Sequence, residues 1–141
     1  MKSEDREDAA EPVTPPRLHH VALWVDDLER MRAFYTGVLG GSAGPRYENP
    51  TTGFRSYFIA FPAGRIELMW QAGRTPPSRD TPVLGYAHVA LSVGGQAAVD
   101  ACIARLRAGG VRIASLPRVT GDGCYEAVIE DPEGNRIEVV E

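Results

Sequence analysis

Large aliphatic residues recur at every second position along residues 18–25, as Val21, Leu23 and Val25, and again along residues 86–93, as Val89, Leu91 and Val93. This spacing is typical of a strand that buries one face and leaves the other face open. We therefore predict a strand in each segment, with its aliphatic residues packed against a helix. In the first segment the open face carries His20, Ala22 and Trp24.

A helical spacing follows each of these strands. Asp26 and Asp27 offer an N-cap for the first helix, the second helix covers residues 96–108, and a pair of glycines ends each of them. Apolar residues recur at intervals of three and four, which predicts one buried stripe on each helix. The stripes consist of Leu28, Met31, Phe34, Tyr35 and Val38 in the first helix, and of Val99, Cys102, Ile103 and Leu106 in the second.

Three further strands are predicted after each helix, because short apolar runs alternate there with Gly, Pro and Asn. The order strand, helix, strand, strand, strand therefore occurs twice. The predicted strands cover residues 44–47, 54–62 and 65–70 in the first half, and residues 111–115, 125–130 and 136–140 in the second half.

The expected fold class is α+β. Residues 1–16 are charged and Pro-rich, and we predict a disordered tail there. Residues 17–141 form one domain, in which a first βαβββ module (18–70) and a second (85–141) are joined by an irregular linker (71–84). A single module would leave one sheet face bare, so we expect the paired modules to form a curled eight-stranded mixed sheet around a metal site.

The two halves also share sequence. His20-Val21-Ala22-Leu23 recurs as His88-Val89-Ala90-Leu91, and Arg65-Ile66-Glu67-Leu68 recurs as Arg136-Ile137-Glu138-Val139. Each half therefore carries one His near its start and one Glu near its end. Both glutamates lie in apolar runs, where a carboxylate is costly unless it is compensated. The predicted metal ligands are His20, Glu67, His88 and Glu138.

Imidazole and carboxylate together suit a divalent first-row metal. Nickel, cobalt and zinc fit best, and iron and manganese are also compatible. His19 competes with His20, but strand alternation sends it to the opposite face. The remaining glutamates of the second half have no counterpart in the first, and we interpret them as surface charges. They are Glu126, Glu130, Glu133 and Glu141.

Composition excludes several functions. The 141 residues carry a net charge of −4 without a basic run, so no nucleic-acid partner is expected. Apolar segments fall short of the roughly 18 residues that a membrane helix needs, and the N-terminus does not resemble a signal peptide. We therefore expect no membrane partner and a cytoplasmic location. The two cysteines do not form a disulfide framework.

Three motifs point to a known family. They are His20-Val21-Ala22-Leu23 with Phe34-Tyr35 and Val38-Leu39-Gly40, then Gly85-Tyr86-Ala87-His88-Val89-Ala90-Leu91, and finally Asp131-Pro132-Glu133-Gly134-Asn135-Arg136-Ile137-Glu138. From residue 18 to 141 the chain resembles the vicinal oxygen chelate superfamily, the glyoxalase and bleomycin-resistance fold. The resemblance implies the same four metal ligands as the repeat, and the His/Glu/His/Glu set is similar to that of glyoxalase I.

The resemblance implies a metal-dependent lyase or isomerase that abstracts a proton next to a metal-chelated carbonyl and hydroxyl pair. A thiol adduct of methylglyoxal is the expected type of small-molecule substrate. Glu138 is the first candidate for the base and Glu67 the second. The alternatives are a sequestering protein of the bleomycin-resistance type and an iron-dependent ring-cleaving dioxygenase. A homodimer is compatible with the fold, because the modules can pair within one chain or between two.

Aromatic and soft apolar residues of the predicted strands are candidates for the substrate pocket. Bacterial glyoxalase I has an Arg four residues after its first ligand, whereas this chain has Trp24. The resemblance therefore implies an aromatic wall there in place of a charged clamp. The predicted substrate-binding residues are Trp24, Tyr57, Phe61, Met69 and Tyr125.

Overall fold

The computed structural model describes residues 14–78 and 82–141. Most of the tail predicted for residues 1–16 lies outside the described residues, and residues 14–16 are exposed and form neither helix nor strand. In the described part of the chain, no helix is long and apolar enough to span a membrane.

The first module begins with the predicted strand and helix. Asp27 caps the helix, because its side chain accepts a hydrogen bond of 3.0 Å from the Arg30 backbone N–H. The helix then continues as a π-helical turn. The elements are β1 (Val21–Trp24), α1 (Leu28–Ala33), η1 (Phe34–Val38), β2 (Ser42–Ala43), β3 (Tyr47–Glu48), β4 (Arg55–Phe61) and β5 (Gly64–Trp70).

The second module repeats this order with a longer helix. Its helix ends where Gly110 adopts a φ of 81°, a conformation that suits glycine. The elements are β6 (Val89–Ser92), α2 (Gln96–Ala108), β7 (Arg112–Val119), β8 (Tyr125–Glu130) and β9 (Arg136–Val140). The α+β class and the paired modules are thus confirmed.

The strands form two sheets. The first has the order β1-β5-β4-β2, with β3 paired to β4, and the second has the order β6-β9-β8-β7. In both sheets the first strand of the module runs parallel to the last, and the other pairs are antiparallel. Among the described residues no strand of one sheet pairs with the other sheet, so one chain does not form the expected continuous eight-stranded sheet. Strands β1 and β6 each lie at a sheet edge.

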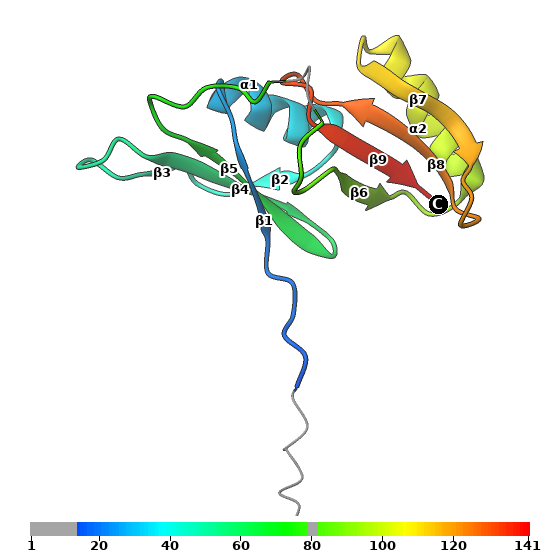
Figure 1. The fold of residues 1–141 in the computed structure, drawn as a ribbon, viewed down its shortest axis with the longest axis horizontal. Helices are drawn as coiled ribbons and strands as arrows, with labels where there is room; N and C mark the ends of the chain where they lie inside the picture. Colours follow the sequence, from blue (N-terminus) through cyan, green and yellow to red (C-terminus); the bar gives the residue numbers. More distant parts are fainter. Residues whose placement is uncertain (1–13, 79–81) are drawn as a thin grey trace, which may run out of the picture.

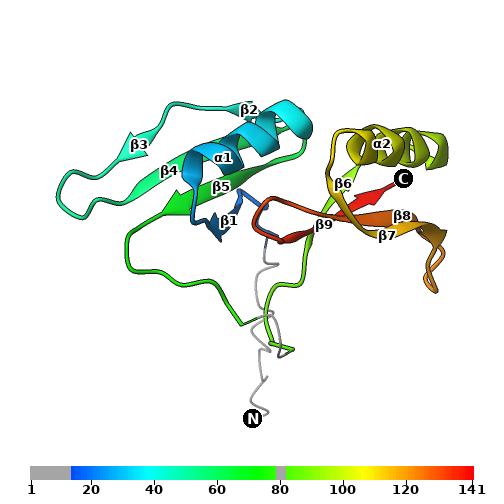
Figure 2. The same cartoon turned by 90° about the horizontal axis from the view of Figure 1, so that it is seen from above.

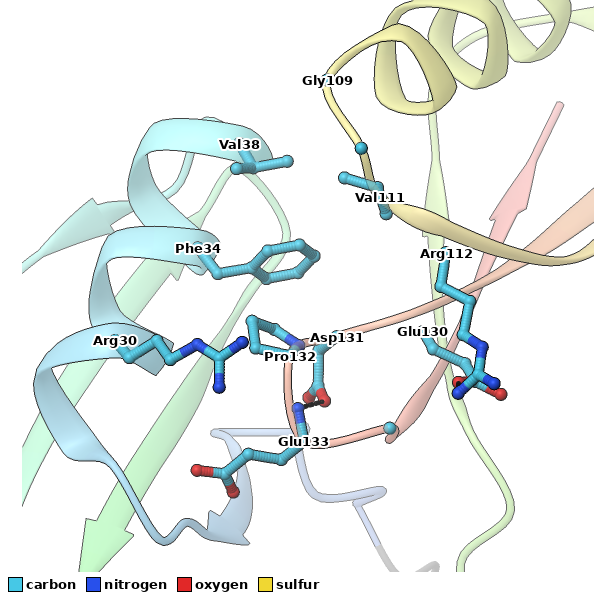
Figure 3. A pocket seen from close by; sticks show the side chains of 12 residues that line it. Arg30, Phe34, Val38, Gly109, Val111, Arg112, Glu130, Asp131, Pro132 and Glu133 are labelled. Atoms are coloured by element: carbon cyan, nitrogen blue, oxygen red, sulfur yellow. Dashed lines mark hydrogen bonds and ion pairs between the residues drawn. The ribbon is translucent and has the colours of Figure 1, made fainter.

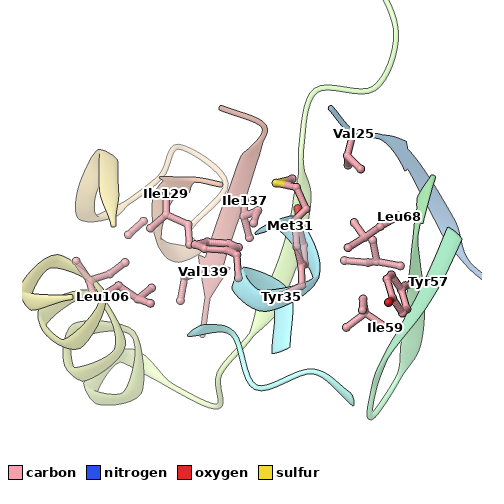
Figure 4. Packing of buried hydrophobic residues seen from close by; sticks show 14 of the residues in the cluster. Val25, Met31, Tyr35, Tyr57, Ile59, Leu68, Leu106, Ile129, Ile137 and Val139 are labelled. Atoms are coloured by element: carbon pink, nitrogen blue, oxygen red, sulfur yellow. The ribbon is translucent and has the colours of Figure 1, made fainter. Parts of the chain in front are cut away.

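Both helices cover the same side of the two sheets (Figures 1 and 2). The buried residues form one cluster that extends over both modules (Figure 4). Met31 and Tyr35 of the first helix are almost fully buried, and Ile137 and Val139 of the second sheet belong to the same cluster. The helix-covered faces are therefore the core, and the opposite sheet faces are available for a site.

Two strands differ from the prediction. The strand expected at residues 44–47 is divided into β2 and β3, because Pro45 between them has no N–H to donate to a ladder. The strand expected at 111–115 continues to Val119 past Pro117. Strand β7 is an edge strand with two register shifts, and a proline is tolerated in such a strand.

Candidate metal centre

The first sheet brings His20 and Glu67 together on its open face. The parallel register of β1 and β5 places Ala22 beside Glu67, and His20 lies just before β1. The distance from His20 Nε2 to Glu67 Oε2 is 3.5 Å. The Glu67 side chain is only 14% exposed, so its carboxylate is largely removed from water. We call this pair the first half-site.

The second sheet repeats the arrangement with the same atoms. The register of β6 and β9 places Ala90 beside Glu138, and His88 lies just before β6. The distance from His88 Nε2 to Glu138 Oε2 is 3.2 Å, and the Glu138 side chain is 18% exposed. We call this pair the second half-site. The duplication visible in the sequence thus extends to the geometry of the side chains.

Each half-site has the spacing of two neighbouring metal ligands. Metal–nitrogen and metal–oxygen bonds of about 2.0 to 2.2 Å place adjacent ligand atoms about 3 Å apart. The observed nitrogen–oxygen distances of 3.5 and 3.2 Å are close to that value. One imidazole and one carboxylate per half-site fit a borderline divalent ion rather than a soft one. The residues present therefore fit the expected metal.

One chain does not bring the half-sites together. Within residues 14–78 and 82–141, no group of three or more His, Cys, Asp or Glu side chains lies close enough to hold a metal. Of the four predicted ligands, all of which lie in the described part of the chain, His20 contacts only Glu67, and His88 contacts only Glu138. Two ligands are too few for a stable catalytic metal site, which commonly has at least three from the protein.

The prediction for His19 was wrong. His19 Nδ1 lies 2.7 Å from His20 Nδ1, so the two imidazoles meet instead of pointing to opposite faces. The physical reason is that β1 begins at Val21. Residues 19 and 20 precede the strand, and the alternation of faces does not apply to them.

Phe58 contributes to the first half-site and was missed in the sequence analysis. It is the register partner of Glu67, and its ring lies edge-on to the His20 ring with centroids 5.1 Å apart. Cross-strand partners share a face of the sheet. Phe58 could therefore have been identified if the pairing of its strand with the strand of Glu67 had been known. Tyr57 and Phe58 are both aromatic, so the sequence alone did not indicate which of them shares a face with Glu67.

Of the predicted substrate-binding residues, Trp24 and Met69 lie on the open face. They are register partners, two residues further along β1 and β5 than the pair of Ala22 and Glu67. The Trp24 residue is 42% exposed, and the Arg74 guanidinium lies over its ring, with Cζ 3.2 Å from the centroid. The linker thus places a cation beside the aromatic wall.

The structure places the other three predicted wall residues on the helix-covered faces. Tyr57 is paired with Leu68 and donates a 2.9 Å hydrogen bond to Glu29; burial and this carboxylate raise the pKa of Tyr57. Phe61 packs against the core. Tyr125 donates a 2.7 Å hydrogen bond to Asp100 of α2, and this bond raises the pKa of Tyr125. These three side chains do not line the open faces.

Two of the glutamates interpreted as surface charges have structural roles. Glu126 is only 9% exposed on the open face of the second sheet, and its Oε1 lies 3.7 Å from Arg118 Nη2. Glu133 accepts hydrogen bonds of 2.9 and 2.8 Å from the backbone N–H groups of Asp26 and Asp27. Both hydrogen bonds of Glu133 connect the second module to the first.

A cavity of about 520 Å³ lies between the modules, beside η1 and the β8–β9 turn (Figure 3). Phe34 and Val38 form one wall, and Val111 and Pro132 line the other side. None of the four predicted metal ligands lines it. The cavity is therefore a feature of the module interface and does not belong to the candidate metal centre.

Known proteins resemble this chain in sequence and in fold. The chain is 34% identical over 129 residues to the lactoylglutathione lyase of Salmonella typhimurium, which covers 89% of this chain and 92% of the relative. It is 35% identical over 81 residues to an ethylmalonyl-CoA/methylmalonyl-CoA epimerase of Cereibacter sphaeroides, over 55% of this chain and 60% of the relative.

The structure is similar to that of the trypanothione-dependent glyoxalase I of Leishmania major, with a TM-score of 0.72 and 26% identity. This match covers 90% of this chain and 87% of the other. The family description that matches residues 17–139 is Glyoxalase/Bleomycin resistance protein/Dioxygenase superfamily. With its duplicated modules and matched His–Glu pairs, the chain belongs to this superfamily.

Proposed function

We propose that this protein is a metal-dependent lyase or isomerase of the glyoxalase I type, which acts on a thiol adduct of methylglyoxal. The observation that carries the proposal is the matched pair of half-sites, each with one imidazole and one shielded carboxylate. The relative named lactoylglutathione lyase, which aligns along most of the chain, supports it.

The proposal includes a second copy of the chain. A homodimer in which the first half-site of one copy faces the second half-site of the other would assemble four ligands, and it would do so twice. Strands β1 and β6 lie at sheet edges next to these half-sites and can approach a partner. Leu84 and Tyr86, just before β6, are fully exposed apolar residues that such an interface would cover.

In the assembled centre, His20 and Glu67 of one copy and His88 and Glu138 of the other would hold a divalent ion, with nickel, cobalt or zinc preferred. The ion would supply Lewis-acid polarisation of the substrate oxygens. Such an ion would need to keep room for substrate oxygens beside its four protein ligands.

The proton transfer falls to a glutamate. We assign it to Glu138, with Glu67 as the alternative, because both carboxylates are shielded from water and border the open face. The carboxylate would take the proton from the carbon that carries sulfur and hydroxyl, and return it to the neighbouring carbonyl carbon, while the proton of that hydroxyl would pass to the neighbouring carbonyl oxygen. The first carbon becomes a thioester carbonyl, the second becomes a hydroxyl-bearing carbon, and no external oxidant is needed.

An epimerase is the second candidate, because the match to the epimerase of Cereibacter sphaeroides includes part of the same fold. Epimerisation also removes and returns a proton next to a carbonyl group. The lactoylglutathione lyase match favours the lyase, since it covers 89% of this chain, whereas the epimerase match covers 55%.

Complementation between two inactive variants tests the proposal. His20→Ala and His88→Ala each damage both sites of a homodimer, and each is expected to lose metal and turnover of the methylglyoxal–thiol adduct. In a mixed dimer one site lacks both imidazoles and the other has all four ligands. Random mixing should therefore restore about a quarter of the active sites.

The outcomes separate the parts of the proposal. Restored metal binding and turnover in the mixture support a centre shared between copies. An inactive mixture of two folded variants would refute sharing. Metal binding without turnover of any thiol adduct would refute the lyase assignment and favour the epimerase.

A further inference from the structure

The open face of the first sheet carries three aromatic rings that contact one another in a row. Trp24 lies edge-on to Phe54, with ring centroids 6.0 Å apart, and the Phe54 ring lies 6.1 Å from the Tyr47 ring. Tyr47 is the register partner of Ser56, and Ser56 pairs with Met69. Because Met69 is the partner of Trp24 and cross-strand partners share a face, the row lies on the open face. We call Trp24, Phe54 and Tyr47 the aromatic row.

The aromatic row lies beside the first half-site. Trp24 is two residues further along β1 than Ala22, the partner of Glu67, which corresponds to about 7 Å along a strand. Phe58, edge-on to the His20 ring, continues the aromatic surface toward the metal ligands. A substrate whose reacting carbons lie at Glu67 can therefore reach the row with its remaining part.

The aromatic row is exposed, and the matching positions of the second sheet carry no rings. Trp24 is 42% exposed and Tyr47 is 55% exposed. In the second sheet Ser92 takes the place of Trp24, and Val140 takes the place of Met69. The repeat thus ends next to the metal ligands. Exposed aromatic surface at such a place is typical of a ligand-binding site.

Arg74 places a positive charge over the aromatic row. After β5 the chain turns at Gly73, which adopts a φ of 84°. The Arg74 guanidinium lies over Trp24, with Cζ 3.2 Å from the ring centroid. Within residues 14–78 and 82–141 this guanidinium has no hydrogen bond or ion pair. Stacking occupies one flat face of the guanidinium, while its N–H donors lie in the plane and stay available to an anion.

We propose that the aromatic row and Arg74 form the subsite for the thiol part of the substrate, and that they select a thiol with an aromatic ring and a carboxylate. This inference rests on the proposed function. The ring would pack against the row in edge-to-face or offset contacts, and the carboxylate would accept hydrogen bonds from Arg74. Such a thiol would cover the exposed rings and neutralise the cation above them.

Methylglyoxal adducts of a matched set of thiols test the inference on the metal-loaded protein. The set consists of para-(mercaptomethyl)benzoate, benzyl mercaptan, mercaptopropionate and mercaptoethanol, which carry ring and carboxylate, ring alone, carboxylate alone, and neither. Wild-type kcat/KM should be highest for the first. Arg74→Met should lower kcat/KM about 10-fold for the two carboxylate thiols only. Phe54→Leu should lower it about 3- to 10-fold for the two aromatic thiols only.

Arg55→Met is the matched control, because Arg55 also lies over a tryptophan, Trp70, which packs against the core instead of lining the open face. It should leave both preferences unchanged. Phe54→Tyr keeps a ring and should retain the preference for aromatic thiols. Circular dichroism checks that each variant is folded.

The outcomes separate this inference from the proposed function. Equal kcat/KM for all four adducts in wild type, or an unchanged carboxylate preference in Arg74→Met, would overturn the inference. Loss of a dimer in Phe54→Leu without a change in thiol preference would assign the row to a second copy and also overturn it. Calorimetry with the S-methyl thioethers of the same thiols measures binding without turnover. Selective thioether binding supports the subsite even if no adduct is turned over, and in that case the lyase assignment fails instead.

Discussion

The Tyr35 hydroxyl donates a 2.9 Å hydrogen bond to Asp131 Oδ2, and this bond joins residues that are 96 positions apart. Tyr35 belongs to η1 of the first module, and Asp131 begins the β8–β9 turn of the second. Asp131 is only 4% exposed and also accepts hydrogen bonds from the backbone of Glu133 and Asn135. The turn and the helix therefore share one buried carboxylate.

We expect Tyr35→Phe to lower the free energy of unfolding by about 1.5 to 3 kcal/mol, because it leaves a buried carboxylate without one of its charge-assisted hydrogen bonds. Urea unfolding followed by circular dichroism measures the change. Tyr47→Phe is the control, since Tyr47 is more than half exposed and should be neutral. Equal stability of the two variants would contradict a role for the bond.

Because of Tyr35, we also expect the free energy of unfolding to depend on pH in the alkaline range. Burial, and next the Asp131 charge, raise the pKa of Tyr35 above its usual value. The unfolded state therefore releases the phenol proton near pH 10, while the folded state keeps it. Below pH 10 the contribution to stability is complete, and above it the free energy of unfolding should fall by up to about 1.4 kcal/mol per pH unit. Stability measured from pH 9 to 11 should fall less steeply in Tyr35→Phe.

Glu138→Gln should abolish turnover while metal content falls less than in His88→Ala. A neutral amide keeps an oxygen for the metal but cannot take a proton from carbon. Metal analysis after dialysis and a turnover assay on the methylglyoxal adduct give the two readings. Full activity in Glu138→Gln would remove this residue from the proton transfer and assign the step to Glu67.

Trp24→Ala should raise KM for the adduct several-fold with a smaller change in kcat, because Trp24 lies on the open face one step from the first half-site. Tyr57→Phe is the matched control from the other face of the same sheet. It should leave KM unchanged and cost only about 1 kcal/mol of stability through the lost bond to Glu29. A KM effect of equal size in both variants would argue against the assigned faces.

The sequence predicted the α+β modules and the two His–Glu pairs, because the strand pattern and the repeat are local signals. It could not predict that the pairs stay apart, since their separation depends on how two sheets pack. It also could not choose between Tyr57 and Phe58. Residues 57–61 of β4 are all apolar, and only pairing with β5 shows that Phe58, and not Tyr57, shares a face with Glu67.

Long-range contacts explain the misinterpreted glutamates. Glu133 lies in a segment whose composition is typical of a surface turn. Its carboxylate nevertheless accepts hydrogen bonds from the backbone of Asp26 and Asp27, which precede it by 107 and 106 positions. Glu126 is shielded by its place in the middle of the second sheet. The spacing of residues near Glu133 and Glu126 in the sequence does not indicate these long-range surroundings.

The contact of Glu133 with the start of α1 also determines how the chain can fold. Helix α1 has six residues, and its first N–H groups benefit from a negative charge at that end. Part of that charge comes from the β8–β9 turn of the second module. The first module therefore reaches its final stability only after the second has formed its β8–β9 turn. We therefore expect the duplicated halves to unfold together as one cooperative unit, although each resembles a complete module.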